Sequence, residues 1–327
     1  MHAMRLPRPG AGLVWTELPD PEPQQGEVRV RVCACGVCRT DLHVQDGELA
    51  AQRYPIIPGH EIVGRIDRLG RGVTGLEEGQ RVGIPWLGHT CGNCFYCRSG
   101  RENLCDHPEF TGATRDGGYA TAAIADARYV FPLGEAGEDA ALAPLLCAGL
   151  IGWRALSAAG EGRRLGLYGF GAAAHIIAQL ARAQGRSVFA FTRPGDEAAQ
   201  EFARSLGACW AGGSDQAAPE PLDAAIIFAS VGALVPAALS AVRKGGIVVC
   251  AGIHMSDIPA FPYRLLWEER QLRSVANLTR QDGLDFLRAA AHHKIVTHVR
   301  PYALRDANQA LADLRAGAFS GAAVLKV

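Results

Sequence analysis

The sequence predicts an α/β protein of two domains, one of which is a doubly wound parallel sheet. The chain has 327 residues, which is longer than a chain that folds around a single hydrophobic core usually is. Its second half alternates short apolar segments with longer helix-like ones, as parallel strands joined by crossover helices require. A glycine-rich turn separates the first such strand from the first helix, which is a further mark of this fold class.

The alternating elements set the limits of the sheet domain. Short apolar runs are expected to be strands, and longer amphipathic runs are expected to be helices. The strands are expected at 164–168, 187–191, 222–229 and 247–253, and the helices at 174–185, 197–207 and 234–246. This alternation places the start of the domain near residue 148 and its end near residue 280.

Charge and hydropathy exclude several classes of partner. The chain carries 33 basic and 33 acidic side chains, a balance that argues against nucleic acid or an anionic membrane as a partner. No apolar run reaches the roughly eighteen residues of a transmembrane helix, and the first residues contain no signal-like segment. We therefore expect a cytoplasmic protein.

Four of the ten cysteines lie in the stretch CGNCFYCRSGRENLC, residues 91–105. A reducing compartment disfavours disulfides. An iron–sulfur motif is disfavoured because seven residues separate Cys97 from Cys105 and Asp106 follows, unlike the ferredoxin spacing. A tetrahedral zinc ion is satisfied by four thiolates and then has no open position for chemistry. The sequence thus predicts a structural zinc ion at Cys91, Cys94, Cys97 and Cys105.

A second group of candidate ligands lies earlier in the chain. Residues 26–34 alternate as a strand does, and Cys38 follows Gly36, where that strand should end. His60 follows a Pro-Gly turn. Together Cys38 and His60 could provide two of the three protein ligands of a catalytic zinc, which keeps its fourth position open. Spacing does not identify the third ligand, which stays open among Cys33, Cys35, Cys147, Cys209 and Cys250.

The glycine-rich turn GFGAAA matches a dinucleotide-binding pattern between a strand and a helix. Gly169 permits a tight turn, Gly171 lets the backbone approach a pyrophosphate, and Ala174 allows close packing of helix and strand. The start of the helix offers N–H groups and a positive dipole end to phosphate. The sequence therefore predicts a Rossmann domain that binds NAD or NADP.

The end of the second strand of this domain favours NADP over NAD. An NAD site usually has an acidic residue about 20 residues beyond the glycines, but here Thr192 and Arg193 occupy that place. A guanidinium attracts the 2′-phosphate of NADP. The alternatives are that Arg193 stacks on adenine or faces solvent, or that Asp196 reaches the ribose from beyond the Pro-Gly turn.

The stretches GVCRTDLHV, PIIPGHEIVG, CGNCFYCRSGRENLC, LLCAG and GFGAAA together resemble the bacterial zinc-dependent alcohol dehydrogenases of the medium-chain dehydrogenase/reductase family. The resemblance runs across nearly the whole chain and includes its closing segment, 299–327. It implies a mostly β, GroES-like catalytic domain with a structural zinc lobe, formed by residues 1–147 and 281–327. The Rossmann domain, residues 148–280, is then inserted between these two parts.

The resemblance also implies roles for residues around the catalytic zinc. Cys147 becomes the third ligand beside Cys38 and His60, so that each chain would hold two zinc ions. Glu61 matches a glutamate that acts as a transient ligand or lies beside the ligands. Asp41 matches the carboxylate that orients the ligand histidine, a support that such ligands generally need.

Further implied roles concern the substrate and the cofactor. Thr40 and His43 match a proton relay, Arg39 matches a position that contacts pyrophosphate, and Trp86 and Leu87 match the wall of a substrate pocket. The implied reaction transfers a hydride between a small alcohol or aldehyde and NAD(P), in a homodimer or homotetramer. One departure is Ala322, which stands where the family often has a basic residue near the cofactor phosphates.

Two other functions stay open from the sequence. A zinc-free quinone or enoyl reductase of the same superfamily would hold no metal. A non-enzymatic zinc or redox sensor would have easily oxidised cysteines and would not turn over alcohols.

Overall fold

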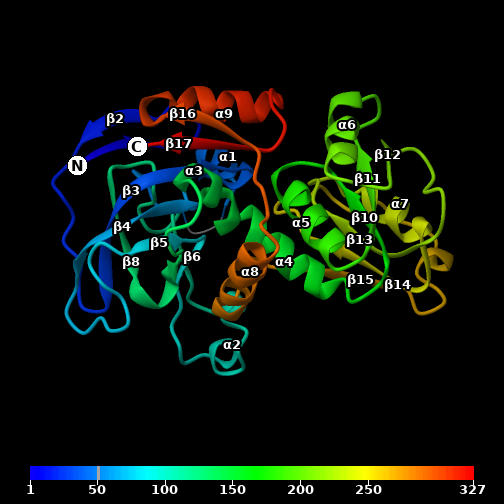
Figure 1. Cartoon of the computed structure of the whole chain (residues 1–327), viewed down its shortest axis with the longest axis horizontal. Coiled ribbons are helices and arrows are strands. Elements are labelled where there is room, and N and C mark those ends of the chain that lie inside the picture. The colour runs from blue at the N-terminus through cyan, green and yellow to red at the C-terminus, as the bar shows by residue number, and fades with distance from the viewer. Residues whose placement is uncertain (50–51) are drawn as a thin grey trace. The chain divides into compact units, whose positions relative to one another are not determined.

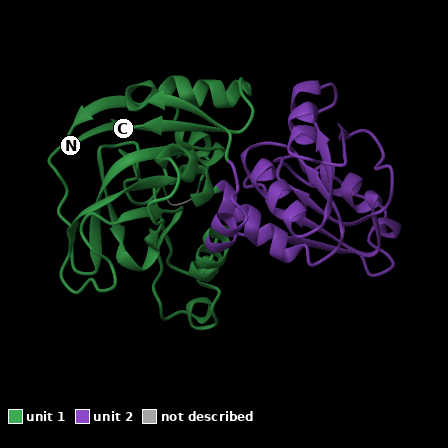
Figure 2. Cartoon of the chain, in the orientation of Figure 1, with its two compact units in different colours: residues 1–147, 277–287, 297–327 green, residues 148–276, 288–296 purple. Residues whose placement is uncertain are grey.

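The computed structural model describes residues 1–49 and 52–327, and the chain divides into two compact units (Figure 2). Unit 1 comprises Met1–Cys147, Asn277–Leu287 and Thr297–Val327, and unit 2 comprises Ala148–Ala276 and Arg288–Val296. The boundary expected at 280/281 falls inside helix α8 (Arg280–His292). As limits of folding domains, the sequence-based boundaries stay a prediction.

Unit 2 is built on a six-stranded parallel sheet with the strand order β12-β11-β10-β13-β14-β15 (Figure 1). Its strands are β10 (Arg164–Tyr168), β11 (Ser187–Thr192), β12 (Trp210–Gly213), β13 (Leu222–Ile227), β14 (Val242–Cys250) and β15 (Gln271–Ser274). The chain order runs outward from β10 on one side and from β13 on the other. Because ligands of doubly wound sheets bind at such a reversal, the cofactor site is expected between β10 and β13. The predicted Rossmann class is confirmed.

The helices of unit 2 connect these strands, and one of them ends earlier than the sequence predicts. The helices are α4 (Ala148–Ala158), α5 (Ala172–Ala183), α6 (Glu197–Ser205) and α7 (Leu234–Ala241), with the short 3-10 helix η4 (Tyr263–Leu265). The predicted helix 234–246 is wrong beyond residue 241, because Val242 is extended and pairs with Leu222. Gly245, at φ 70°, is also incompatible with a continuing helix. The predicted strand 247–253 ends at Cys250.

Unit 1 is mostly β, and its main sheet combines strands from the first half of the chain with two strands from its end (Figure 1). The strand order is β16-β17-β3-β4-β5-β9, with β8 also paired to β3. The strands are β3 (Glu27–Val37), β4 (Ile62–Leu69), β5 (Arg81–Ile84), β8 (Ala122–Asp126), β9 (Phe131–Pro132), β16 (Val299–Ala303) and β17 (Ala322–Lys326). Since β17 is antiparallel to β3, the last strand of the chain completes a sheet whose first strand begins at Glu27.

Smaller elements surround this sheet. Two separate antiparallel pairs join β1 (His2–Arg5) to β2 (Val14–Glu17) and β6 (Leu87–His89) to β7 (Glu109–Phe110). The helices are α1 (Arg39–Asp46), α2 (Phe95–Arg98), α3 (Asp139–Leu142), α9 (Ala307–Ala316), and the 3-10 turns η1 (Glu102–Leu104), η2 (Ala127–Tyr129), η3 (Ala143–Leu146) and η5 (Leu304–Asp306).

The central strand β3 shows why its sequence folds as it does. Val28, Val30 and Val32 are buried in the core, whereas the intervening Arg31 is exposed. This is the alternation that predicts a half-buried strand. Nearer its end, β3 is flanked by both β17 and β4, and Cys35 lies in the core. The strand therefore delivers the chain rigidly to Cys38.

Within the described residues, no single helix is both long and apolar enough to cross a membrane. Among those described residues, one pair of helices joined at a bend, 139–146 and 148–158, is long and apolar enough when the two are taken together, by length and composition alone.

Candidate active site and metal centres

Cys38 lies where β3 passes into α1. It is the N-cap of α1, with φ −124° and ψ 165°. The Thr40 N–H donates to Cys38 Sγ at 3.3 Å, and the Asp41 carboxylate accepts from the Cys38 N–H at 2.9 Å. These reciprocal bonds form a capping box. The sequence Cys-Arg-Thr-Asp thus both starts the helix and fixes the direction of the thiol.

Asp41 also orients His60, which is fully buried. Asp41 Oδ1 lies 3.2 Å from His60 Nδ1 and accepts from the Gly59 N–H at 3.2 Å. No local sequence pattern points to Tyr119, yet its buried hydroxyl donates to Asp41 Oδ2 at 3.0 Å. With Nδ1 facing the carboxylate, Nε2 is left for a ligand. Among the described residues, Nε2 has no hydrogen-bond partner, as expected of a nitrogen reserved for a metal ion.

The structure brings four of the expected residues into one group. One ligand atom each from Cys38, His60, Glu61 and Cys147 lies within 4.8 Å of all the others, and the two sulfur atoms are 3.9 Å apart. Two thiolates on a tetrahedral zinc ion lie about 3.8 Å apart, given Zn–S bonds of about 2.3 Å. The group therefore fits zinc. In the part of the chain described, the other candidate third ligands lie outside it: Cys33, Cys35, Cys209 and Cys250.

Glu61 approaches this group because residue 36 has no side chain. Glu61 is buried, and a Cβ atom built on Gly36 would lie only 1.8 Å from Glu61 Oε2. Any larger residue at position 36 would push the carboxylate aside. The glutamate can therefore act as a fourth, exchangeable ligand next to the two thiols and the imidazole.

The ionisation of the group is set by its own members. The hydrogen bond from the Cys147 thiol lowers the pKa of Cys38 well below its usual value, and His60 adds to this effect against the cost of burial. Burial acts to lower the pKa of His60, but the charges of Asp41 and Cys38 outweigh it and leave that pKa raised. Without metal, the group therefore holds protons that a zinc ion must displace.

Zinc binding to this group is expected to strengthen as pH rises. His60 with a raised pKa stays protonated until higher pH, and only the neutral imidazole binds metal. The affinity should change about tenfold per pH unit for each proton displaced. Competition with a chromogenic chelator at pH 6, 7 and 8 measures this. An affinity that does not vary over this range would contradict the assignment.

The two relay candidates lie on one face of α1, three residues apart. Thr40 is buried and stands two residues after Cys38, at the start of the helix. His43 is mostly buried, and its Nδ1 lies 2.5 Å from Glu48 Oε2. Arg39, the first residue of the helix, is exposed. The sequence reasoning did not single out Glu48.

An aromatic wall borders the metal group. The Trp86 ring meets the His60 ring edge-on with centroids 4.9 Å apart, and it stacks on Phe110 at 4.9 Å. Trp86 is partly exposed, as a residue facing a substrate would be. Leu87, by contrast, is fully buried, and its place in the wall of a substrate pocket stays a prediction.

The four-cysteine lobe also has the geometry of a metal site. One sulfur atom from each of Cys91, Cys94, Cys97 and Cys105 lies within 4.8 Å of the others. Cys91 Sγ is 4.0 Å from Cys97 Sγ and 3.5 Å from Cys105 Sγ, against about 2.05 Å for a disulfide. Backbone N–H groups of Cys97 and Asp106 lower the pKa of Cys94 to about 6, which favours a thiolate. The lobe therefore fits a four-thiolate zinc ion.

The glycine-rich turn lies at the carboxyl end of β10. Gly169 has φ 87°, a conformation that side chains disfavour. Gly171 is the N-cap of α5, and a Cβ atom there would meet no protein atom within 4 Å. That space is what a pyrophosphate above the helix would fill. Ala174 is fully buried on the sheet side of α5. These residues fit a dinucleotide.

The residues at the end of β11 have different surroundings. Thr192 is buried, and its hydroxyl lies 3.1 Å from the Arg193 carbonyl and 3.3 Å from the Gly212 carbonyl. Arg193 is exposed, and no acidic partner for it is found among the described residues. Asp196 Oδ1 accepts from the Ala199 N–H at 3.0 Å and so caps α6. The Asp196 carboxylate is therefore used to cap α6, whereas the exposed Arg193 side chain can reach a ligand.

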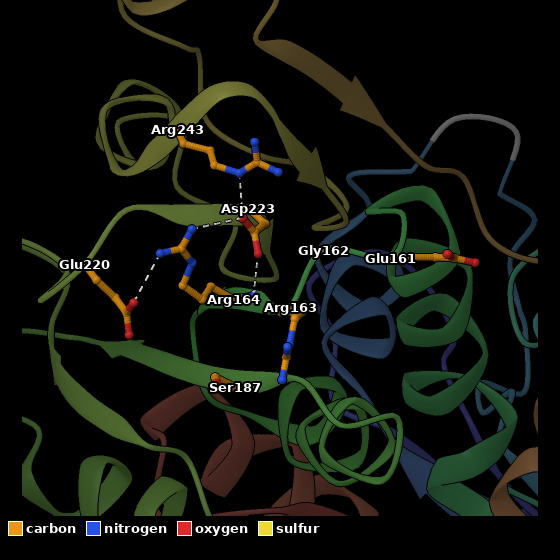
Figure 3. Close-up of a pocket in the computed structure, with 8 residues that line it drawn as sticks. All are labelled: Glu161, Gly162, Arg163, Arg164, Ser187, Glu220, Asp223 and Arg243. Carbon is orange, nitrogen blue, oxygen red and sulfur yellow. Dashed lines mark hydrogen bonds and ion pairs between the residues drawn. The ribbon is translucent and has the colours of Figure 1, made fainter.

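A cavity of about 700 Å³ opens at the amino-terminal ends of β10 and β11, opposite the glycine-rich turn of unit 2 (Figure 3). Asp223 pairs there with Arg164 at 3.3 Å and with Arg243 at 2.6 Å, while Glu220 pairs with Arg164 at 3.2 Å. Cofactors of such sheets bind at the carboxyl ends, so this cavity is not the cofactor site. Its ion pairs instead tie together the start of β10, β13 and β14.

Comparisons with known proteins agree with this arrangement. Residues 24–135 match the family model described as the alcohol dehydrogenase GroES-like domain. The chain is 47% identical to "Probable alcohol dehydrogenase AdhA" of Mycobacterium tuberculosis over 341 residues, covering 100% of this chain and 97% of the relative.

Two solved structures are similar over the whole chain. One is the cobalt- and zinc-bound thermostable alcohol dehydrogenase from Pyrobaculum aerophilum, at 26% identity and a TM-score of 0.91, covering 100% of this chain and 99% of that one. The other is acetophenone reductase from Geotrichum candidum in complex with NAD, at 25% identity and a TM-score of 0.90, covering 100% and 97%. The expected resemblance is confirmed: the chain belongs to the zinc-type medium-chain alcohol dehydrogenase family.

Proposed function

We propose that this protein is a zinc-dependent alcohol dehydrogenase and aldehyde reductase that transfers a hydride between an alcohol and NAD(P). The observation that carries the proposal is the group of Cys38, His60 and Cys147, which offers three ligands for zinc, with Glu61 as an exchangeable fourth. The same chain carries a Rossmann sheet with a glycine-rich turn, so that both parts of a hydride-transfer enzyme are present.

Zinc held by Cys38, His60 and Cys147 would supply Lewis acidity toward the substrate oxygen, and a nicotinamide cofactor held by the glycine-rich turn would supply the hydride chemistry. The residues of the chain do the rest. Asp41 holds the His60 ring so that Nε2 faces the metal position, and Tyr119 and the Gly59 N–H hold Asp41 in turn. Trp86 meets the His60 ring edge-on and places an apolar surface beside it, which favours the hydrocarbon part of a small alcohol or aldehyde.

The proton of the alcohol needs an acceptor within the chain. Thr40 lies next to Cys38 and is the residue we assign to receive it by hydrogen bonding. His43, one turn further along the helix, passes the proton on. Gly169, Gly171 and the start of α5 bind the pyrophosphate, with Arg39 as an exposed cation that can contribute.

The experiment is a direct assay of the purified chain. We expect absorbance of NAD(P)H to appear with primary alcohols and to disappear with aldehydes, and we expect about two zinc ions per chain. Full activity in chain stripped of metal would favour the zinc-free reductase. Bound zinc without turnover of any alcohol or aldehyde would favour the sensor.

We propose NADP as the preferred cofactor, because Arg193 is exposed and Asp196 is used to cap α6. Replacing Arg193 by alanine is expected to lower kcat/KM for NADP⁺ about tenfold or more, since a charge-assisted hydrogen bond is worth about 1.5–3 kcal/mol. The value for NAD⁺ should hardly change. The control is Arg163→Ala. Arg163 is also an exposed arginine of unit 2, but it lies at the amino-terminal end of β10. An equal loss with both cofactors would show that Arg193 acts elsewhere than on the 2′-phosphate.

We further propose that the enzyme is a cytoplasmic homodimer or homotetramer. All ten cysteines are free, which suits a reducing compartment. Within the described residues, β15 is the outer strand of its sheet, and Tyr263 and Trp267, which precede it, are exposed. Open strand edges and exposed apolar side chains are typical of interfaces. Light scattering should give a multiple of 34.7 kDa.

A further inference from the structure

We propose that Glu48 is a positioning residue for His43 and the outlet through which the proton released by alcohol oxidation reaches water. The inference rests on the proposed dehydrogenase function and adds a residue to its proton path. Its basis is the contact of 2.5 Å between His43 Nδ1 and Glu48 Oε2. In that contact, His43 has 15% of its side chain exposed and Glu48 has 50%.

The difference in exposure indicates the direction in which a proton would leave the pair, from the covered His43 to the exposed Glu48. His43 lies on the same helix as Thr40 and is largely covered, so a proton that reaches its ring has little direct access to solvent. Glu48 touches that ring with one carboxylate oxygen and is half in water. Because a carboxylate exchanges protons rapidly with solvent, the exit runs through Glu48. Carboxylate–imidazole pairs also fix the tautomer and orientation of the ring.

The end of α1 is built so that Glu48 returns to His43. Gly47 adopts a left-handed conformation with φ 78°, and its N–H bonds to the carbonyls of His43 and Val44. The Glu48 N–H then donates to the His43 carbonyl at 3.0 Å. Glycine is required at 47 both for this φ value and because a Cβ atom would lie 2.8 Å from Pro9 Cβ. Backbone and side chain of Glu48 thus hold the same histidine.

Neighbouring charges leave this pair intact. The nearby cation Arg315 forms two hydrogen bonds of 2.8 Å with Asp46. Arg315 is therefore hydrogen-bonded to Asp46, and the structure shows its guanidinium bound there. The Tyr54 hydroxyl donates to the Val44 carbonyl at 2.7 Å and holds the last turn of the helix in place. The end of the helix from which Glu48 follows is therefore held in place by the fold.

The proton balance of this step is simple. Oxidation of an alcohol by NAD(P)⁺ yields the aldehyde, NAD(P)H and one proton. That proton arrives at His43 Nε2 while the Nδ1 proton passes to the Glu48 carboxylate, which releases it to water and is regenerated. Exchange with solvent returns the ring to its first tautomer. In aldehyde reduction the same groups carry one proton inward.

The test compares five variants of the zinc-loaded enzyme with the wild type. Glu48→Gln keeps the size of the side chain but accepts no proton. It should lower kcat for alcohol oxidation about tenfold, with unchanged KM and zinc content. This is less than the roughly 10²–10⁴-fold contributed by a group that acts directly as general acid or base, because Glu48 acts through His43. Its solvent deuterium isotope effect on kcat should rise, because proton release then limits turnover. Glu48→Asp should keep most of the activity.

The matched control is Glu135→Gln. Glu135 is an exposed glutamate of the same unit that pairs with Arg65 at 2.6 Å, and its replacement should leave kcat and the isotope effect unchanged. Glu48→Ala should be rescued by added acetate or formate, whereas His43→Gln should not be.

The outcomes separate the two proposals. Wild-type kcat and isotope effect in Glu48→Gln would overturn the role of Glu48 alone. A loss that comes with lower zinc content or a lower melting temperature, and that acetate does not rescue in Glu48→Ala, would show a structural role and overturn it too. A wild-type enzyme that oxidises no alcohol would overturn the dehydrogenase function and this inference together.

Discussion

Serine in place of Cys147 is expected to remove nearly all alcohol oxidation and one of two zinc ions per chain. The structure puts Cys147 Sγ 3.9 Å from Cys38 Sγ, and a serine hydroxyl replaces a thiolate poorly as a zinc ligand. Losing the metal removes several kcal/mol of transition-state stabilisation, so kcat/KM should fall on the order of a thousandfold. Zinc analysis and steady-state kinetics measure both effects.

Cys209→Ser is the control for this variant. Cys209 is an exposed cysteine in unit 2, outside both metal groups, and its replacement should change neither zinc content nor kcat/KM. If Cys147→Ser kept two zinc ions and wild-type activity, the ligand assignment would be wrong, and with it the proposed metal centre.

Serine in place of Cys105 should produce the second large effect, a loss of stability rather than of chemistry. Helix α2 in the lobe has no buried residue, so the lobe has little core of its own and depends on its metal. A structural zinc ion supplies folding free energy directly, roughly several kcal/mol for such a site. We expect one zinc ion per chain to be lost and the melting temperature to drop by about ten degrees or more.

The damage should spread from the lobe to α8. Glu102 of the lobe accepts from the Arg280 N–H at 2.9 Å, and the Asn277 side chain donates to the Asn103 carbonyl at 3.0 Å. Hydrogen exchange should therefore rise at the start of α8. Cys33→Ser, in the same unit but outside the lobe, is the control. A Cys105→Ser protein with unchanged melting temperature would show that the lobe is not stabilised by metal.

Much of the fold could be predicted because the patterns that specify it are local. The alternation of valines and arginines in β3 and the strand–glycine turn–helix at 164–185 need only a few consecutive residues. The helix predicted at 234–246 is wrong at its end because the apolar pattern continues through Val242, where pairing with Leu222 on β13 replaces helical bonding. A sequence pattern does not contain that competition between sheet and helix.

Some residues of the site could be predicted from short motifs, whereas others depend on contacts between distant parts of the chain. Cys38 and the lobe cysteines stand in short motifs, but spacing left Cys147 among five candidates, since it lies 109 residues from Cys38. Only the family resemblance singled it out. Glu48 had one local signal, the Gly47 that ends α1. Its contact with His43 depends on the path of the backbone after that glycine, which no residue pattern specifies.

The two metal groups differ in how much chain must be present before each can form. The lobe cysteines all lie within residues 91–105, whereas the other group is complete only with Cys147, after β3, α1 and the turn at His60 have come together. Closing a short loop costs less entropy than closing a long one. During synthesis the lobe can therefore capture its ion early, from a short stretch of newly made chain.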